Sequence, residues 1–131
     1  NTIDLGSEIE IVNAYLFLQK MRFGQNLQFH VDVPASLNGS QVITQGLLTL
    51  VENAIKHNEA SNENPLLIDI SLEGRDYIVV KNNLRRKKMT QPSTGIGLPN
   101  IISRCESLTS NPVIIREVAN EFIVKLPIIH A

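Results

Sequence analysis

Several residue types that mark particular classes of protein are scarce in this chain. Its 131 residues include one cysteine, Cys105, which excludes an internal disulfide framework and a cysteine-based zinc cluster. Twelve basic residues against thirteen acidic ones leave a net charge of −1, so no strong positive field marks a nucleic-acid-binding protein. No hydrophobic run approaches the roughly 20 residues that a membrane-spanning helix needs. These absences leave an ordinary globular domain as the expected class.

Length and composition agree with one domain over residues 1–131. Hydrophobic residues make up 43% and charged residues 19%, which is enough apolar surface for a core and too little net charge for disorder. The sequence starts at Asn1 without a methionine and shows no signal peptide. We therefore expect a piece of a longer protein.

The hydrophobic pattern alternates between helical and strand periods and predicts an α+β fold. Helices are expected at about 7–22, 41–58 and 97–107, with residues 1–22 assigned to the first helical segment and a capping box of Ser7 and Glu10 at its start. Strands are expected at about 27–33, 66–72, 77–82, 113–117 and 121–127. Residues 83–96 show no period and are expected to form a loop. The sum is a two-layer sandwich in which three helices cover a mixed, mostly antiparallel sheet of about five strands.

The second helix has two distinct faces. An expected core stripe comprises Leu47, Leu50, Val51, Ala54 and Ile55. The opposite face combines a hydroxyl, an acid, an amide, an ammonium and an imidazole: Thr49, Glu52, Asn53, Lys56 and His57. A solvated surface explains polar residues there, whereas Asn is a mediocre residue within a helix and its place beside Lys56 and His57 points to chemistry. The pattern alone leaves both interpretations open.

A glycine-containing segment precedes the third helix and reads Ser93-Thr94-Gly95-Ile96-Gly97-Leu98. Glycines permit close backbone approach to a ligand, and N–H groups at a helix start favour an anion such as phosphate. An ordinary turn into a helix would look the same, so the segment is a weak signal by itself. It lacks the third glycine of a dinucleotide fingerprint and the Lys-Ser/Thr of a P-loop.

Together the two segments resemble a known family. Residues 50–57 read Leu-Val-Glu-Asn-Ala-Ile-Lys-His, and a hairpin and a loop separate them from Ser-Thr-Gly-Ile-Gly-Leu-x-Asn-Ile with Arg104 beyond. This arrangement is similar to the ATP-binding catalytic domain of bacterial sensor histidine kinases, in the superfamily shared with gyrase, Hsp90 and MutL. Within that family it looks most like the autolysis-regulator class, and the resemblance runs from about residue 5 to Pro127.

The resemblance implies a site for ATP and Mg²⁺ and a role for each residue. Asn53 would hold the metal, because an amide oxygen is a hard ligand. Lys56 would approach the terminal phosphates, His57 would lie near adenine or ribose, and Glu52 would orient a metal-bound water. Residues 83–96 would form a lid over the nucleotide. Phosphate contacts are implied for the segment that comprises Ser93, Thr94, Gly95, Ile96, Gly97 and Leu98.

Two positions distinguish this chain within the superfamily. Members that hydrolyse ATP carry a general-base Glu one turn before the asparagine, where this chain has Thr49, so the resemblance implies transfer to a protein acceptor. The family's Asp-x-Gly-x-Gly is replaced by Asn82 and the four residues after it, without either glycine. Asn82 can still accept a hydrogen bond from the adenine amino group, more weakly than a carboxylate.

The resemblance also implies partners. The γ-phosphate would pass to a histidine on a dimerisation domain outside this chain, and then to a response regulator. The parent protein would be a membrane-anchored homodimer with this domain in the cytoplasm. Two alternatives stay open: a degenerate module that only transmits conformational signals, and a serine kinase of the anti-sigma-factor type.

The remaining candidates are interpreted as structural. His30 and His130 are expected on the surface, and Cys105 lies on the apolar stripe of the third helix. The basic run of residues 85–88 is most simply a solvated part of the loop, or a lid that brings cations near the triphosphate.

Overall fold

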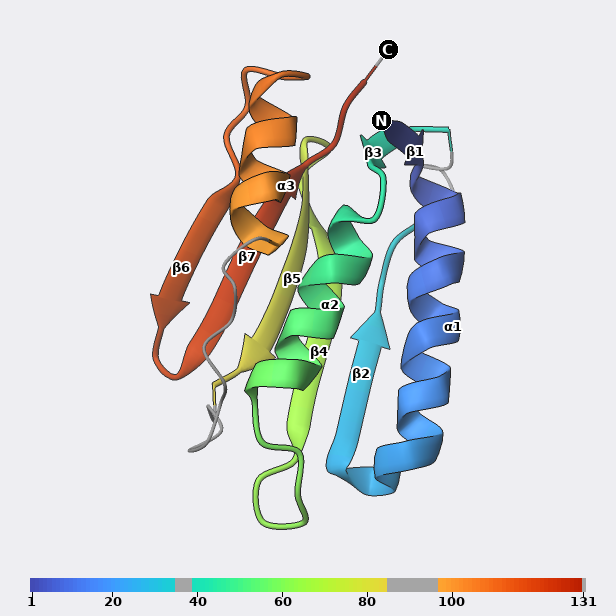
Figure 1. Ribbon diagram of the computed structural model, residues 1–131, viewed down its shortest axis with the longest axis vertical. Coiled ribbons are helices and arrows are strands. Elements are labelled where there is room, and N and C mark those ends of the chain that lie inside the picture. Colours follow the sequence, from blue (N-terminus) through green and yellow to red (C-terminus); the bar gives the residue numbers. More distant parts are fainter. Residues whose placement is uncertain (35–38, 85–96, 131) are drawn as a thin grey trace.

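Three helices pack on one face of a five-stranded sheet in a computed structural model that describes residues 1–34, 39–84 and 97–130 (Figure 1). In chain order the elements are β1 (Thr2–Asp4), α1 (Leu5–Phe23), the 3₁₀ turn η1 (Gly24–Asn26), β2 (Leu27–Val31), β3 (Gln41–Ile43), α2 (Gly46–His57), β4 (Leu66–Glu73), β5 (Tyr77–Asn83), α3 (Gly97–Glu106), β6 (Ile114–Val118) and β7 (Glu121–Pro127). None of the helices in these ranges is long and apolar enough to cross a membrane.

The five-stranded sheet has the order β2-β4-β5-β7-β6. β2 and β4 run parallel, and each of the other neighbouring pairs is antiparallel. β4 and β5 form a hairpin whose turn uses Gly74 at φ 61°, a left-handed conformation that favours glycine. The mixed, mostly antiparallel sheet and the helical layer confirm the α+β two-layer prediction.

Helices and sheet bury a shared apolar layer between them. All five residues of the predicted α2 stripe are buried, and so are Ile101 and Cys105 on α3. Alternate residues of the central strands point into the same core, namely Ile68, Ile70, Ile78, Val80, Val124 and Leu126. α2 lies over the middle of the sheet and packs against β4, β5 and β7, which makes it the rigid support for its own polar face.

The start of the first helix differs from the prediction. Asp4, and not Ser7, is the N-cap residue: its Oδ2 accepts a hydrogen bond from the backbone N–H of Ser7 at 3.2 Å. Ser7 and Glu10 are exposed on the helix that Asp4 starts, so the predicted capping box is wrong. Residues 2–4 form strand β1 in place of helix.

The second helix is shorter than predicted because residues 41–43 form a strand. β3 pairs antiparallel with β1, and the two make a small separate sheet. Gln45 then adopts a left-handed conformation at φ 65°, which changes the direction of the backbone before α2 starts at Gly46. The contacts of β3 are distant in sequence: it pairs with β1, Gln41 bridges to Ile129, and Val42 and Ile43 are buried in the core, none of which local periodicity reveals.

Candidate functional site

The first turn of α3 meets the middle of α2 at a glycine. A Cβ atom built on Gly97 would lie 3.3 Å from Cγ2 of Thr49 and 3.5 Å from Nδ2 of Asn53. The absence of a side chain therefore lets the α3 backbone approach the Asn53 amide closely. The fold thus brings together two of the segments that the sequence singles out, the polar face of α2 and the start of α3.

The α2 polar face is divided between two neighbours. Asn53 is half-buried and faces α3, whereas Glu52 is exposed and lies near Tyr15 of α1. Burial raises the pKa of Tyr15, and the negative charge of Glu52 raises it further. Lys56 is exposed and His57 is half-buried in the last turn. The Asn53 amide and the Lys56 ammonium therefore lie on the side of α2 that faces α3 or solvent, whereas the Glu52 carboxylate lies toward α1.

Asn82 is buried near the end of β5, with 3% of its surface exposed. It lies in register with Ile68 of β4 and Phe122 of β7, and it alternates with Lys81 so that it shares the helix-facing side with Val80. Its Nδ2 atom donates a hydrogen bond to the backbone carbonyl of Asn83 at 2.9 Å. An amide therefore occupies the helical side of the sheet at the end of β5.

The neighbouring Asn83 has a role that the sequence analysis missed. Its Oδ1 accepts from the N–H of Leu67 at 2.8 Å, and its Nδ2 donates to the carbonyl of Pro65 at 2.9 Å. This side chain ties the end of β5 to the start of β4. Two consecutive asparagines after a hydrophobic strand are the available signal, because Asn readily bonds to backbone groups.

Part of the predicted phosphate-binding segment lies outside the described residues. This applies to Ser93, Thr94, Gly95 and Ile96, to the basic run 85–88, and to all of the predicted lid except residues 83 and 84. Leu98 is described and is half-buried in the first turn of α3.

The described residues contain no group of three or more His, Cys, Asp or Glu side chains that could hold a metal ion. Mg²⁺ is commonly bound by one or two protein oxygens together with substrate phosphates and waters. A single amide oxygen from Asn53, beside the glycine start of α3, fits that mode of binding and does not fit an all-protein cage.

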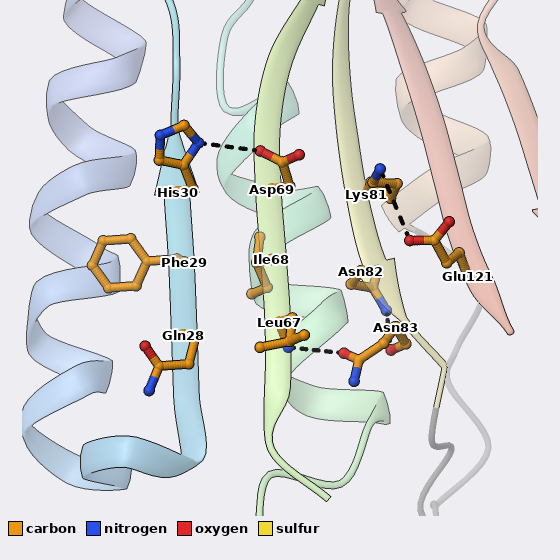
Figure 2. A pocket seen from close by; sticks show the side chains of 10 residues that line it. All are labelled: Gln28, Phe29, His30, Leu67, Ile68, Asp69, Lys81, Asn82, Asn83 and Glu121. Carbon is orange, nitrogen blue, oxygen red and sulfur yellow. Dashed lines mark hydrogen bonds and ion pairs between the residues drawn. The ribbon is translucent and has the colours of Figure 1, made fainter.

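A separate hollow of about 310 Å³ opens on the other face of the sheet (Figure 2). Its rim carries two ion pairs, His30 Nδ1 to Asp69 Oδ1 at 3.6 Å and Lys81 Nζ to Glu121 Oε2 at 3.9 Å. The lining residues are Gln28, Phe29, His30, Leu67, Ile68, Asp69, Lys81, Asn82, Asn83 and Glu121. None of the residues of the α2–α3 contact is among them, although Asn82, which is predicted to contact adenine, is.

Sequence comparison relates the chain to sensor histidine kinases. It is 30% identical to the sensor histidine kinase BtsS of Escherichia coli K12 over 105 residues, which are 78% of this chain and 18% of BtsS. It is 38% identical to the sensor protein LytS of Staphylococcus haemolyticus over 72 residues, 53% of this chain and 12% of LytS. The chain thus spans less than a fifth of the length of these relatives. No family model matches it.

Structural comparison gives the same assignment at the level of the fold. The catalytic domain of the histidine kinase ThkA superposes with a TM-score of 0.63 at 18% identity, covering 97% of this chain and 96% of that one. The similarity therefore extends over a complete catalytic domain and confirms the expected fold. From its sequence relatives and its architecture, the chain belongs to the family of sensor histidine kinase catalytic domains.

Proposed function

We propose that this domain binds ATP with Mg²⁺ between α2, α3 and the 83–96 segment, and donates the γ-phosphate to a histidine on a dimerisation domain. The observation that carries the proposal is the close approach of Gly97 to Asn53, where a Cβ atom on the glycine would lie 3.5 Å from the amide nitrogen. It puts a helix start, which favours phosphate, beside an amide, which can ligate magnesium.

Each side chain of the site has a separate task in this proposal. The Asn53 oxygen would hold Mg²⁺, which would neutralise negative charge on the phosphates. Lys56 approaches the terminal phosphates, and His57 lies beside adenine or ribose. Glu52 would orient a water at the metal from the α1 side of α2, and Asn82 would accept a hydrogen bond from the adenine amino group. Backbone N–H groups of Gly95 and Gly97, with Ser93, Thr94, Ile96 and Leu98 around them, contact the phosphates.

The reaction favoured by these residues is transfer and not hydrolysis. The position one turn before Asn53 is Thr49, whose methyl group packs toward Gly97. A hydroxyl in that place is a poor general base for activating water, so the reacting phosphate is kept for a protein acceptor. The chain supplies position and charge, with no covalent intermediate of its own.

The proposed partners and cellular location of the protein rest on its membership of the same family. The fold neighbour ThkA is known in a complex with the response regulator TrrA. For this chain we propose a response regulator as the final acceptor. We also propose that residues 1–131 are a single ATP-binding domain, with 83–96 as its lid, in the cytoplasmic part of a membrane-anchored homodimer.

Nucleotide titration of this chain tests the binding step. We expect saturable binding of ATP, and of a non-hydrolysable analogue, that strengthens when Mg²⁺ is added. No binding at millimolar nucleotide would favour the degenerate signalling module, which the loss of both glycines after Asn82 supports. The acceptor is tested in the full-length kinase with γ-labelled ATP. An acid-labile product indicates phosphohistidine, whereas an acid-stable one would favour the serine-kinase alternative.

A further inference from the structure

The start of α2 is capped by a side chain from another helix. Gln45, the N-cap residue, is left-handed at φ 65° and makes no capping side-chain bond within the described structure. Glu8 of α1 replaces it: its two carboxylate oxygens accept from the N–H groups of Gln45 and Leu48 at 3.2 and 3.3 Å. Glu8 is fully buried. A negative charge at a helix start satisfies unpaired N–H groups and interacts favourably with the helix dipole.

A second long side chain reaches the same point from α3. Nη2 of Arg104 donates to the carbonyl oxygen of Thr44 at 2.8 Å. Residues 44–48, which we call the α2 corner, are therefore bonded to α1 through Glu8 and to α3 through Arg104. Both contacts are long-range in sequence, and both act on the backbone.

The second contact between α2 and α3 is the candidate site. The two helices lie side by side and run in opposite directions (Figure 1). Arg104 joins the end of α3 to the α2 corner, and Gly97 joins the start of α3 to Thr49 and Asn53. Seven residues of helix separate the two points, about 10 Å. α3 also packs into the core through Ile101 and Cys105, and the Arg104 contact adds a polar constraint on its position along α2.

We propose that Arg104 and Glu8 are positioning residues of the nucleotide site, which act through the α2 corner to keep Gly97 against Asn53. This inference rests on the proposed function. The burial of Glu8 supports it, because both side-chain oxygens are withdrawn from solvent and accept hydrogen bonds from the backbone of the α2 corner.

The main test uses Arg104→Met, which retains side-chain length and loses the donors. We expect ATP affinity with Mg²⁺ to fall about 2- to 30-fold, the range for changes that act through a packed network. Arg104→Lys should recover part of the loss, since one donor is restored. Arg116→Met on exposed β6 is the matched control and should bind as the unmodified chain does. Measurements are made at a temperature at which circular dichroism shows every variant folded.

Unchanged ATP affinity in a folded Arg104→Met variant would overturn the proposal, because a purely structural role predicts that result. If Arg104→Met does not fold, Arg104→Lys and Glu8→Gln provide the comparison. Each retains part of the bonding, and each should weaken ATP more than Arg116→Met does. Equal affinities in all three would then overturn the proposal.

Amide hydrogen exchange without nucleotide separates this inference from the proposed function. Loss of the corner contact should speed exchange in residues 97–104 and 46–53 relative to the β4–β5 amides. If the unmodified chain binds no nucleotide, the proposed ATP-binding function is wrong. The exchange rates of the Arg104 variant still test the positioning role in that case. Exchange that is unchanged in both helices would overturn it.

Discussion

Gly97 and Asn53, on different helices, lie so close that a Cβ atom on the glycine would stand 3.5 Å from the asparagine amide nitrogen and 3.3 Å from the Thr49 methyl. The start of α3 is thus in contact with the residue proposed above to hold Mg²⁺. The distance leaves space for a backbone and little for a side chain.

Gly97→Ala should weaken ATP binding about fivefold or more, since a crowded Cβ must displace Thr49 or Asn53. Its backbone has no positive φ, so strain of that kind is not the cause. The double variant Gly97→Ala with Thr49→Ser removes the nearer methyl group and should recover much of the affinity. Titration calorimetry measures both, and equal losses in the single and double variants would contradict the steric explanation.

Asn53→Ala should leave the fold intact and reduce Mg²⁺-dependent ATP affinity at least about tenfold, because even residues that only orient a metal ligand contribute that much. Autophosphorylation in the full-length kinase should be lost. Asn53→Asp, which changes the charge at the metal, should also be inactive. Asn13→Ala, at an exposed position of α1, is the control. Retained activity in the Asn53 variants would refute the metal role.

Asn82→Ala should lower ATP affinity about 2- to 10-fold, the value of one ordinary hydrogen bond. The effect should be absent with GTP, because guanine offers no amino donor at the matching place. Asn82→Asp restores the family's acceptor but loses the donor to the Asn83 carbonyl, so it should bind ATP more tightly than Asn82→Ala. Asn62→Ala, an exposed change, is the control. Equal loss for both nucleotides would show that Asn82 acts on folding and not on adenine.

The elements that the sequence predicts correctly are those in which hydrophobic residues repeat at a regular helical or strand spacing. The α2 stripe of Leu47, Leu50, Val51, Ala54 and Ile55 repeats at helical spacing and is buried as expected. Strands β4 and β5 alternate, and the glycine turn between them is a local signal. By contrast, β1 and β3 have three residues each and form through pairing with segments distant in sequence, so neither strand contains the information alone.

The site shows the same division. The roles of Asn53 and Gly97 are expected only from resemblance to a family, since spacing within α2 cannot distinguish a metal-binding face from a solvated one, and their close approach is seen only in the structure. Local sequence does not reveal Glu8 as a cap, because its two N–H partners lie on another helix. The pattern also favours Ser7 as the N-cap, although Asp4 is one turn earlier and equally suitable by residue type.

Cys105 predicts a specific alkaline instability. Burial raises the pKa of its thiol from 9.0 to about 11, although the Arg104 charge lowers it in part. Between these values the unfolded chain loses the thiol proton while the folded chain keeps it, so rising pH favours unfolding. The free energy of unfolding should fall by about 2–3 kcal/mol from this group between about pH 9 and 11. The free energy of unfolding of Cys105→Ala, measured with denaturant at the same pH values, should lack this pH-dependent decrease, whatever the absolute stability of the variant. An identical pH dependence in both proteins would contradict a thiol that stays protonated in the core.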